Sequence, residues 1–220
     1  MKKAVSQPEK NRLSRGVLIV LEGIDGTGKS TQAEILHDGL ESAGYDSVRF
    51  REPSDSRWGR EIREKAARAD SLTPEEELEL FQADRRDNVK RHLKPALDQK
   101  KVVILDRYYF STIAYQGAKG IDPERIRREN ELFAVPPDLV FILDIHPGHG
   151  LGRIEGRGPR ALLFEREDYL EKVRRIFHSF QGERFVHIDA SEAVETITSR
   201  IKGIVFAFLK DLTKKVSPEK

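Results

Sequence analysis

The sequence predicts an α/β fold in which a five-stranded parallel sheet carries helices on both faces. Two observations indicate it. Five short apolar runs are separated by longer stretches with helical spacing, and the first run is apolar at consecutive positions rather than alternate ones. Such a run is typical of a strand buried on both faces, and strands that alternate with helices form parallel sheets. With 220 residues the chain is long enough for one such domain.

The expected strands follow one another at regular intervals along the chain. Ligands of parallel α/β sheets bind at the carboxyl ends of the strands, so the residues that follow each strand are the candidates for a site. We expect strands at residues 16–22, 47–51, 102–106, 139–144 and 186–189.

The helices are marked by their ends. Residues 32–43 have apolar positions at helical spacing and stop at Gly44, because glycine is favoured just after a helix. Thr73 and Pro74 open a helix with a capping box, which we expect to run through about His92. A further helix opens at Asp122, before two prolines interrupt the chain.

Composition narrows the classes of function. Lys and Arg number 39 against 37 Asp and Glu, and this balance gives no indication of a nucleic-acid or membrane partner. The absence of cysteine excludes disulfides and thiol chemistry. No segment has the length of a signal peptide or a membrane span, so we expect a cytoplasmic protein. Residues 1–15 and 213–220 are expected to be flexible tails of a single domain, residues 16–212.

Residues 147–167 lack a regular apolar pattern and are rich in glycine and arginine. This composition predicts a mobile basic lid. A solvated, salt-bridged loop is the alternative, and we favour it for the last two of the four arginines, which are Arg153, Arg157, Arg160 and Arg166.

A glycine-rich string lies between the first strand and the first helix. It has the form G-x-x-x-x-G-K-S, in which backbone N–H groups and the helix N-terminus converge on phosphate oxygens. Lys29 would reach the β- and γ-phosphates of ATP, and the Ser30 hydroxyl would ligate Mg²⁺. The alternative is a glycine turn at the start of an ordinary helix. The expected nucleotide-binding residues are Gly23, Ile24, Asp25, Gly26, Thr27, Gly28, Lys29, Ser30 and Thr31.

Polar residues follow the second and third strands. Arg51 ends the second strand, and Asp106 and Arg107 end the third, where a carboxylate could hold Mg²⁺ or its waters. A surface ion pair or a helix cap is the alternative for Asp106. Phe81 and Arg85 are four residues apart on one helix and therefore share a face. By themselves they are weak evidence of a site, because a phenylalanine at helical spacing is more often a core residue and an arginine near it is more often solvated.

Taken together, these motifs resemble those of the bacterial thymidylate kinases, which are nucleoside monophosphate kinases of the P-loop NTPase type. The resemblance extends from about Val17 to Leu209. Its most specific part is the string that begins at Asp106. The motifs are Glu22-Gly-Ile-Asp-Gly-Thr-Gly-Lys-Ser-Thr-Gln32, Arg51-Glu52-Pro53, Phe81-x-x-Asp84-Arg85 and Asp106-Arg107-Tyr108-x-x-Ser111-x-x-Ala114-Tyr115-Gln116-Gly117.

The resemblance implies transfer of the γ-phosphoryl group of Mg-ATP to dTMP, and commonly a homodimer. It would place Asp25 at the sugar 3′-hydroxyl and the metal–phosphate network, and Phe81 against thymine. Arg51, Arg85 and Arg107 would grip the acceptor phosphate. The residues expected near base and sugar are Thr112, Tyr115 and Gln116.

The lid is expected to supply an arginine whose positive charge acts on the transferred phosphoryl group. Some members of the family carry an arginine after the aspartate of the phosphate loop, whereas others supply it from the lid. The chain has Gly26 at that position, so the resemblance implies a lid arginine. The expected catalytic residues are therefore Lys29, Arg107, Arg153 and Arg157.

One segment departs from the family pattern. Many thymidylate kinases follow Arg-Glu-Pro with Gly-Gly-Thr, but here Ser54, Asp55 and Ser56 follow. We expect Asp55 to face solvent or to pair with Arg57 or Arg60. This departure leaves open which nucleoside monophosphate is the preferred acceptor.

Other functions remain as alternatives. A kinase for another deoxynucleotide or for a nucleoside is the nearest. A GTP-hydrolysing switch is disfavoured because the guanine-reading motif Asn-Lys-x-Asp is absent, and the intact Lys29, Ser30 and Asp106 argue against a non-catalytic nucleotide sensor. The six histidines form no zinc-binding pattern, so we expect no zinc site.

Overall fold

The protein is described by a computed structural model for residues 11–68, 72–148 and 160–213. The predicted five-stranded sheet is confirmed. All strand pairings are parallel, and the spatial order is β2-β3-β1-β4-β5. The three middle predictions have the observed bounds, while the first and last strands differ by one residue. The strands are β1 Val17–Glu22, β2 Ser47–Arg51, β3 Val102–Asp106, β4 Leu139–Asp144 and β5 Phe185–Asp189.

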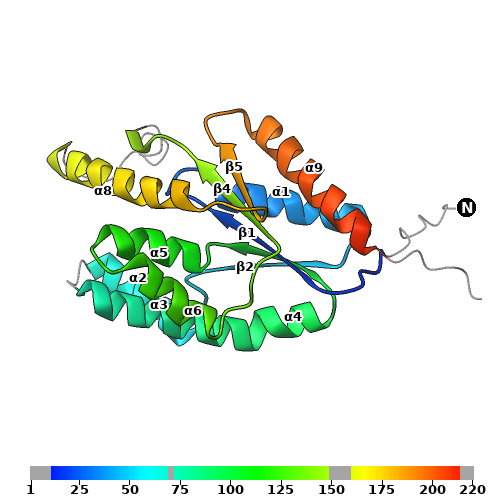
Figure 1. Ribbon diagram of the computed structural model, residues 1–220, viewed down its shortest axis with the longest axis horizontal. Helices are drawn as coiled ribbons and strands as arrows, with labels where there is room; N and C mark the ends of the chain where they lie inside the picture. Colours follow the sequence, from blue (N-terminus) through cyan, green and yellow to red (C-terminus); the bar gives the residue numbers. More distant parts are fainter. Residues whose placement is uncertain (1–10, 69–71, 149–159, 214–220) are drawn as a thin grey trace, which may run out of the picture.

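Helices cover the sheet on both faces (Figure 1). On one face α1 packs against α9, and on the other α5 packs against α3, α6 and α8. The short helix α2 lies against α3 and closes one side of the molecule. The helices are α1 Lys29–Ser42, α2 Arg57–Arg68, α3 Pro74–Asn88, α4 Lys94–Asp98, α5 Tyr109–Ala118, α6 Pro123–Glu131, α8 Arg160–Ser179 and α9 Val194–Leu212.

Helix α3 begins as predicted but ends differently. The Thr73 side chain accepts a hydrogen bond from the Glu76 N–H, and the Glu76 carboxylate accepts one from the Thr73 N–H, which completes the capping box. The α-helical part stops at Asn88, where a π-helical turn over Val89–Leu93 leads into α4. Pro95 has no N–H to continue a regular α-helical ladder, and a wider turn just before it accommodates that loss.

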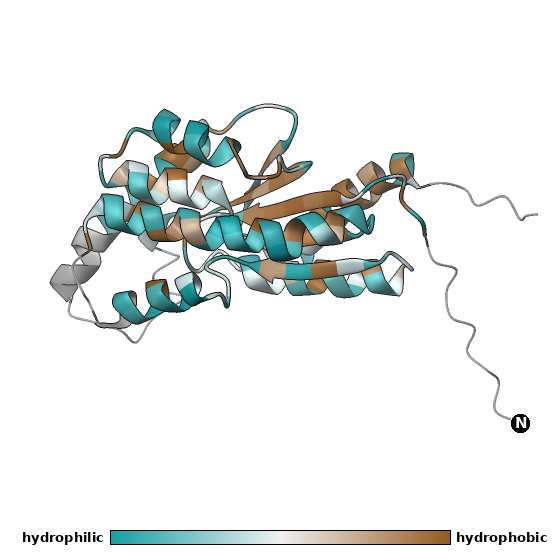
Figure 2. Ribbon diagram, turned by 90° about the horizontal axis from the view of Figure 1, so that it is seen from below, coloured by the Kyte–Doolittle hydropathy of each residue, from teal (hydrophilic) through white to brown (hydrophobic). Residues whose placement is uncertain are grey.

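The core lies between the sheet and its helices. Val17–Leu21 of β1 and Val102–Leu105 of β3 are almost completely buried, because these two strands occupy the middle of the sheet. Figure 2 shows the strands as a hydrophobic layer, with the hydrophilic residues of the helices facing outward. The central strands therefore fix the position of their carboxyl ends, where the charged residues begin.

Residues 11–15, which we expected to belong to a flexible tail, are placed against the fold. The Asn11 N–H donates to the Gly44 carbonyl at 2.9 Å, and the Ser14 N–H donates to the Leu212 carbonyl at 2.9 Å. Leu13 between them is 4% exposed. Burial of this one leucine and the backbone pairing explain why the ordered fold starts earlier than its charged sequence suggests. The rest of the expected tails, residues 1–10 and 214–220, lies outside the described residues.

Part of the expected lid is helical. Helix α8 begins at Arg160, inside the segment 147–167, because the residues that follow are good helix formers. Arg153 and Arg157 lie outside the described residues. In the described part of the chain, no helix has both the length and the apolar character needed to cross a membrane.

Candidate active site

The glycine-rich string forms a loop between the end of β1 and the start of α1. Gly23 lies so close to β4 that a Cβ atom there would come within 2.3 Å of the Leu143 carbonyl oxygen. Gly28 has a φ of 84° and forms the N-cap of α1, a conformation that glycine adopts without strain. The loop therefore directs the helix N-terminus toward the carboxyl edge of the sheet, which is an arrangement that binds phosphate.

Lys29 is folded over this loop. Its Nζ donates to the Ile24 carbonyl at 2.7 Å and lies 3.3 Å from the Thr27 hydroxyl, and the residue is 6% exposed. Burial, and secondarily the nearby Arg107 cation, lower the pKa of Lys29 to about 7. A phosphate group at the loop would supply the counter-charge that the ammonium group needs.

Ser30 and Asp106 meet at the end of the loop. The Ser30 hydroxyl donates to Asp106 Oδ2 at 2.5 Å. The other carboxylate oxygen, Oδ1, is buried and has no hydrogen-bond partner among the described residues. A hydroxyl beside a carboxylate with an unsatisfied oxygen suits Mg²⁺, which usually takes one or two carboxylates together with substrate phosphates.

Arg107 joins the phosphate loop to α5. Its Nη2 donates to Asp25 Oδ1 at 2.5 Å, and its Nη1 donates to the Gly23 carbonyl at 3.1 Å and to the Ser111 hydroxyl at 3.0 Å. The backbone of Arg107 has a φ of 69°, in the left-handed region that non-glycine residues seldom adopt. Such conformations persist where the surroundings hold them, and they cluster at functional sites.

Glu22, at the end of β1, holds the turn after Arg107. Its carboxylate accepts hydrogen bonds from the Tyr108 and Ser111 N–H groups at 2.8 and 3.1 Å and from the Ser111 hydroxyl at 2.5 Å. Complete burial raises the pKa of Glu22 to about 7, although these hydrogen bonds and Arg107 oppose the rise. The Glu22 carboxylate thus orients Ser111, and the Ser111 hydroxyl in turn accepts a hydrogen bond from Arg107.

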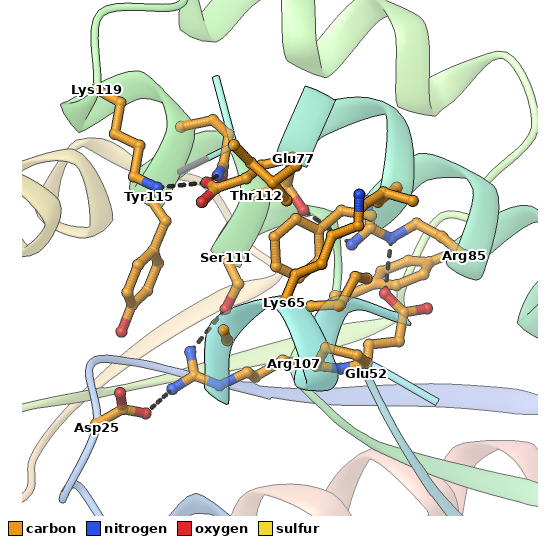
Figure 3. Close-up of a pocket in the computed structure, with 18 of the residues that line it drawn as sticks. Asp25, Glu52, Lys65, Glu77, Arg85, Arg107, Ser111, Thr112, Tyr115 and Lys119 are labelled. Carbon is orange, nitrogen blue, oxygen red and sulfur yellow. Dashed lines mark hydrogen bonds and ion pairs between the residues drawn. The ribbon is translucent and has the colours of Figure 1, made fainter. Parts of the chain in front are cut away.

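A cavity of about 310 Å³ lies beside the phosphate loop, under α3 and α5 (Figure 3). Asp25 and Arg107 line one end, close to the loop. Phe81 and Arg85 come from α3, and the α5 residues line the wall opposite. Seven of the eight predicted substrate residues line this one cavity, namely Asp25, Phe81, Arg85, Arg107, Thr112, Tyr115 and Gln116.

The eighth residue, Arg51, borders a second cavity, of about 480 Å³, together with Ser30 and Asp106. Its side chain is 65% exposed, and its nearest acid is Asp55 at 3.9 Å. Arg51 therefore stands on the side of the loop where Ser30 and Asp106 lie, with only a weak ion pair, since an exposed pair of that length stabilises little. Its charge is available to a substrate phosphate.

Arg85 has a different environment from the one we expected. It is 1% exposed, and its Nε donates to Glu52 Oε2 at 2.8 Å. Its Nη1 donates to Asn130 at 2.7 Å and its Nη2 to the Thr112 hydroxyl at 2.9 Å. Glu52 balances the charge of this guanidinium. Arg85 is therefore less suited than Arg51 or Arg107 to neutralise a phosphate.

The segment that departs from the family pattern is fixed by Asp84. The Ser54 N–H and hydroxyl donate to the Asp84 carboxylate at 2.7 and 2.5 Å, and the Ser56 hydroxyl donates to it at 2.7 Å. Ser56 Oγ also accepts from the Trp58 and Gly59 N–H groups at 3.1 Å, which caps α2. The two serines thus tie the loop after β2 to the residue that precedes Arg85.

Asp55, between those serines, faces solvent as predicted, with 86% of its side chain exposed. The expected ion pairs with Arg57 or Arg60 are not the ones observed. The carboxylate pairs with Arg63 at 3.1 Å and more distantly with Arg51, while Arg60 donates to the Asp55 backbone carbonyl. The reason is helical geometry, because α2 turns Arg63 back toward the loop that precedes it.

Comparison with known proteins agrees with this geometry. A sequence model of the family described as thymidylate kinase matches residues 21–201. The chain is 46% identical to a thymidylate kinase of Brachyspira hyodysenteriae over 87% of its own length and 94% of the relative. It is 42% identical to a probable thymidylate kinase of Archaeoglobus fulgidus over 88% and 96% of the two chains.

The chain belongs to the thymidylate kinase family. It is therefore a nucleoside monophosphate kinase with the α/β fold of that family, in which ATP is the phosphoryl donor and dTMP the acceptor. The cavity of this thymidylate kinase lies beside the phosphate loop and is lined by Asp25 of that loop.

Several residues of this thymidylate kinase site were not predicted from sequence. Glu22 follows a buried strand just as Asp106 does, so the same pattern could have indicated it. Glu52 and Asp84 belong to the recognised motifs, but their pairing with Arg85 and Ser56, and that of Asn130 with Arg85, was not indicated, because each pair is separated by at least 28 residues along the chain. No group of three or more His, Asp or Glu side chains gathers into a metal site within residues 11–68, 72–148 and 160–213.

Proposed function

We propose that the chain phosphorylates dTMP with the division of roles that the two ends of the cavity indicate. The observation that carries the proposal is that one cavity joins the phosphate loop to Phe81 and Arg85. A pyrimidine held between them would direct its 5′-phosphate toward Asp25 and Arg107. The acceptor and donor phosphates would then meet above Lys29.

On the donor side, the loop N–H groups and Lys29 bind the β- and γ-phosphates. Ser30 and Asp106 are the residues that would hold Mg²⁺, which when bound neutralises charge on those phosphates. The unsatisfied Asp106 Oδ1 supports this assignment.

On the acceptor side, Arg107 and Arg51 hold the acceptor phosphate, and Asp25 orients Arg107 and contacts the sugar 3′-hydroxyl. The second pKa of a phosphate monoester is about 6, so at neutral pH the acceptor is mostly a dianion and needs no general base. Catalysis then consists of alignment and charge stabilisation.

The base would stack on Phe81, with Thr112, Tyr115 and Gln116 around it. We assign Arg85 to the base rather than to the phosphate, because Glu52 already balances its charge and Thr112 binds its Nη2. A neutralised guanidinium still donates hydrogen bonds, and a base carbonyl accepts them.

We propose that Arg153 or Arg157 completes the catalytic charge. A residue of this kind contributes about 10³- to 10⁵-fold in rate. Replacement of the right one by alanine should lower kcat with little change in nucleotide affinity. Near-normal turnover in both single variants and in the double variant would overturn the assignment.

The substrate assignment is tested by ADP release from Mg-ATP with dTMP, dUMP, dCMP, AMP, GMP and thymidine as separate acceptors. We expect dTMP to give the largest rate. If dTMP gave no more ADP than the control without acceptor, the proposal would fail, and a large rate with thymidine alone would indicate a nucleoside kinase.

We also propose that this single-domain kinase, residues 16–212, works as a homodimer in the cytoplasm without a nucleic-acid or membrane partner. The near balance of charges supports the absence of a polyanionic partner. Sedimentation equilibrium at micromolar protein tests the dimer, and a purely monomeric distribution would contradict it.

A further inference from the structure

Arg107 is held by the chain segment that leads into the phosphate loop. Its backbone N–H donates to the Leu21 carbonyl at 3.0 Å, and the next N–H along the chain, that of Tyr108, donates to the Glu22 carboxylate at 2.8 Å. The Arg107 guanidinium donates to the Gly23 carbonyl at 3.1 Å. Consecutive residues at the end of β1 thus fix both the backbone and the side chain of Arg107, and they maintain its left-handed conformation.

The Ser111 hydroxyl connects Glu22 to the Arg107 guanidinium. It donates its only proton to Glu22 Oε2 at 2.5 Å. Its oxygen then has only lone pairs to offer, and it accepts from Arg107 Nη1 at 3.0 Å (Figure 3). A carboxylate accepts hydrogen bonds and cannot donate them, so the ionised form of Glu22 determines which way the Ser111 hydroxyl points.

A simpler role for Glu22 would be to cap α5. Its Oε1 accepts from the N–H groups of Tyr108 and Ser111 at the start of that helix, where a carboxylate is stabilising. Capping uses Oε1 alone, whereas Oε2 accepts from the Ser111 hydroxyl. The two carboxylate oxygens therefore have separate partners, and their roles can be tested separately.

We propose that Glu22 is a positioning residue for the acceptor phosphate and that it acts through the Ser111 hydroxyl, which holds the Arg107 guanidinium at the cavity. Arg107 and Ser111 line the cavity, while Glu22 is completely buried behind them. The inference rests on the proposed function, in which Arg107 holds the acceptor phosphate. It gives a role to Glu22, for which the motifs indicated none.

The proposal concerns the phosphate of the acceptor and not its base or sugar. Thymidine and dTMP differ only in the 5′-phosphate, so contacts with the base and the sugar contribute equally to the binding of both. The ratio of their dissociation constants therefore isolates the interaction of the guanidinium with the phosphate. Such charge-assisted hydrogen bonds depend on geometry, so a displaced guanidinium should weaken dTMP binding alone.

Glu22→Gln is the variant that tests the proposal. The two N–H groups at the start of α5 require the amide oxygen, so the cap is kept and the amide nitrogen faces Ser111. That nitrogen donates to the Ser111 oxygen and competes there with Arg107. We expect the Kd of dTMP to rise about tenfold and that of thymidine to change by less than about twofold. Isothermal titration at pH 8 measures both, since the pKa of Glu22 is about 7 and the carboxylate predominates there.

Glu41→Gln is the matched control. Glu41 accepts from the Ser47 N–H and hydroxyl at 2.7 and 2.9 Å, and His37 Nδ1 lies 2.8 Å from the same hydroxyl. This cluster has the same form but lies at the opposite edge of the sheet, because Ser47 begins β2 whereas Glu22 ends β1. The control should leave both dissociation constants unchanged.

Ser111→Ala is a second variant, which removes the hydroxyl and keeps the N–H group that donates to Glu22. It should raise the Kd of dTMP by a similar factor. The double variant should bind dTMP no more weakly than Ser111→Ala, because Glu22 acts through the missing hydroxyl. Two effects that multiply would overturn the inference.

The remaining outcomes separate the inference from the function on which it rests. Urea unfolding establishes that each variant is folded. If the unmodified protein binds dTMP no more tightly than thymidine, the proposed contact between Arg107 and the phosphate fails. If it prefers dTMP and folded Glu22→Gln keeps that preference, only the inference is overturned. The same holds if both dissociation constants rise equally, since Glu22 would then serve the packing of α5 alone. Should Glu22→Gln not fold, an unchanged ratio in Ser111→Ala overturns the inference.

Discussion

The phosphate loop and the acceptor cavity lie side by side but are constructed in different ways. The loop is one continuous segment, residues 23–30, whose backbone N–H groups we propose as the phosphate-binding groups. The cavity is formed mainly by side chains from α2, α3 and α5 and from the segments that follow β2 and β3, and buried polar pairs such as Arg85–Glu52 and Asp84–Ser54 hold them. The loop thus depends on backbone conformation, and the cavity depends on a network of buried side chains.

This difference predicts different consequences of mutation. A substitution in the loop should reduce turnover and leave the fold intact. A substitution in the cavity network should reduce stability and acceptor affinity together, because the same hydrogen bonds support both.

The largest effect is expected from Glu52→Ala. It would leave Arg85 as a buried cation without its counter-charge, which destabilises a protein by about 3–5 kcal/mol. Urea unfolding monitored by circular dichroism measures the loss. Glu124→Ala is the control, because Glu124 forms an exposed pair with Arg127 at 3.4 Å, and such pairs contribute less than about 1 kcal/mol. If Glu52→Ala were no more destabilising than its control, the cavity network would not be a source of stability.

Lys29→Met should reduce kcat by about 10²- to 10³-fold, since it removes a charge aimed at the transferred phosphoryl group. Its stability should not fall, because burial already lowers the pKa of Lys29 to about 7 and methionine needs no counter-charge. Turnover and urea unfolding are compared with those of Lys172→Met on the surface of α8. A variant with normal turnover, or with a stability loss like that of Glu52→Ala, would remove the contrast between the two regions.

Much of the fold could be predicted from sequence because its determinants are local. The bounds of β2, β3 and β4 follow from short apolar runs, and the start of α3 follows from the capping box at Thr73. The glycine-rich string was recognisable for the same reason. The residues of the string are consecutive in the chain, and the apolar patterns on either side of it indicated the strand before it and the helix after it.

The side-chain hydrogen bonds that hold the cavity could not be predicted in that way. The pairing of Arg85 with Glu52, and of Gln116 with Glu77, depends on how α3 lies against β2 and α5. Sequence spacing placed Phe81 and Arg85 on one face but did not indicate that Arg85 would be neutralised. The exposed position of Asp55 was predicted but its ion-pair partner was not, because several arginines of α2 were within reach and only the folded loop selects Arg63.

Ser56→Ala should have a smaller effect in the cavity region. It removes the cap of α2 and one hydrogen bond to Asp84, which together contribute about 1 kcal/mol. We expect KM for dTMP to rise about fivefold with little change in kcat, since the loop after β2 positions the acceptor and not the donor. Ser199→Ala on the exposed face of α9 is the control. A fall in kcat with KM unchanged would place Ser56 with the donor machinery instead.

The smallest expected effect is the uptake of a proton when ATP binds. With a pKa of about 7, Lys29 is about nine-tenths uncharged at pH 8 in the free protein, and ATP phosphates should restore its charge. ATP binding should therefore take up close to one proton at pH 8 and much less at pH 6. Calorimetry in buffers with different ionisation enthalpies measures this number. Glu22 titrates in the same range, so Lys29→Arg, which retains Glu22 and stays charged, isolates the contribution of Lys29. Equal uptake in both proteins would contradict the assignment.

The central claim is that the acceptor cavity is formed by its own side-chain network and selects the base before ATP binds. Isothermal titration of the nucleotide-free protein with dTMP, and separately with dCMP, tests it most directly. We predict that dTMP binds with one site per chain in the absence of ATP and that dCMP gives no measurable binding at the same concentration. Binding of dTMP only after a non-hydrolysable ATP analogue is added, or equal binding of the two monophosphates, would contradict the claim.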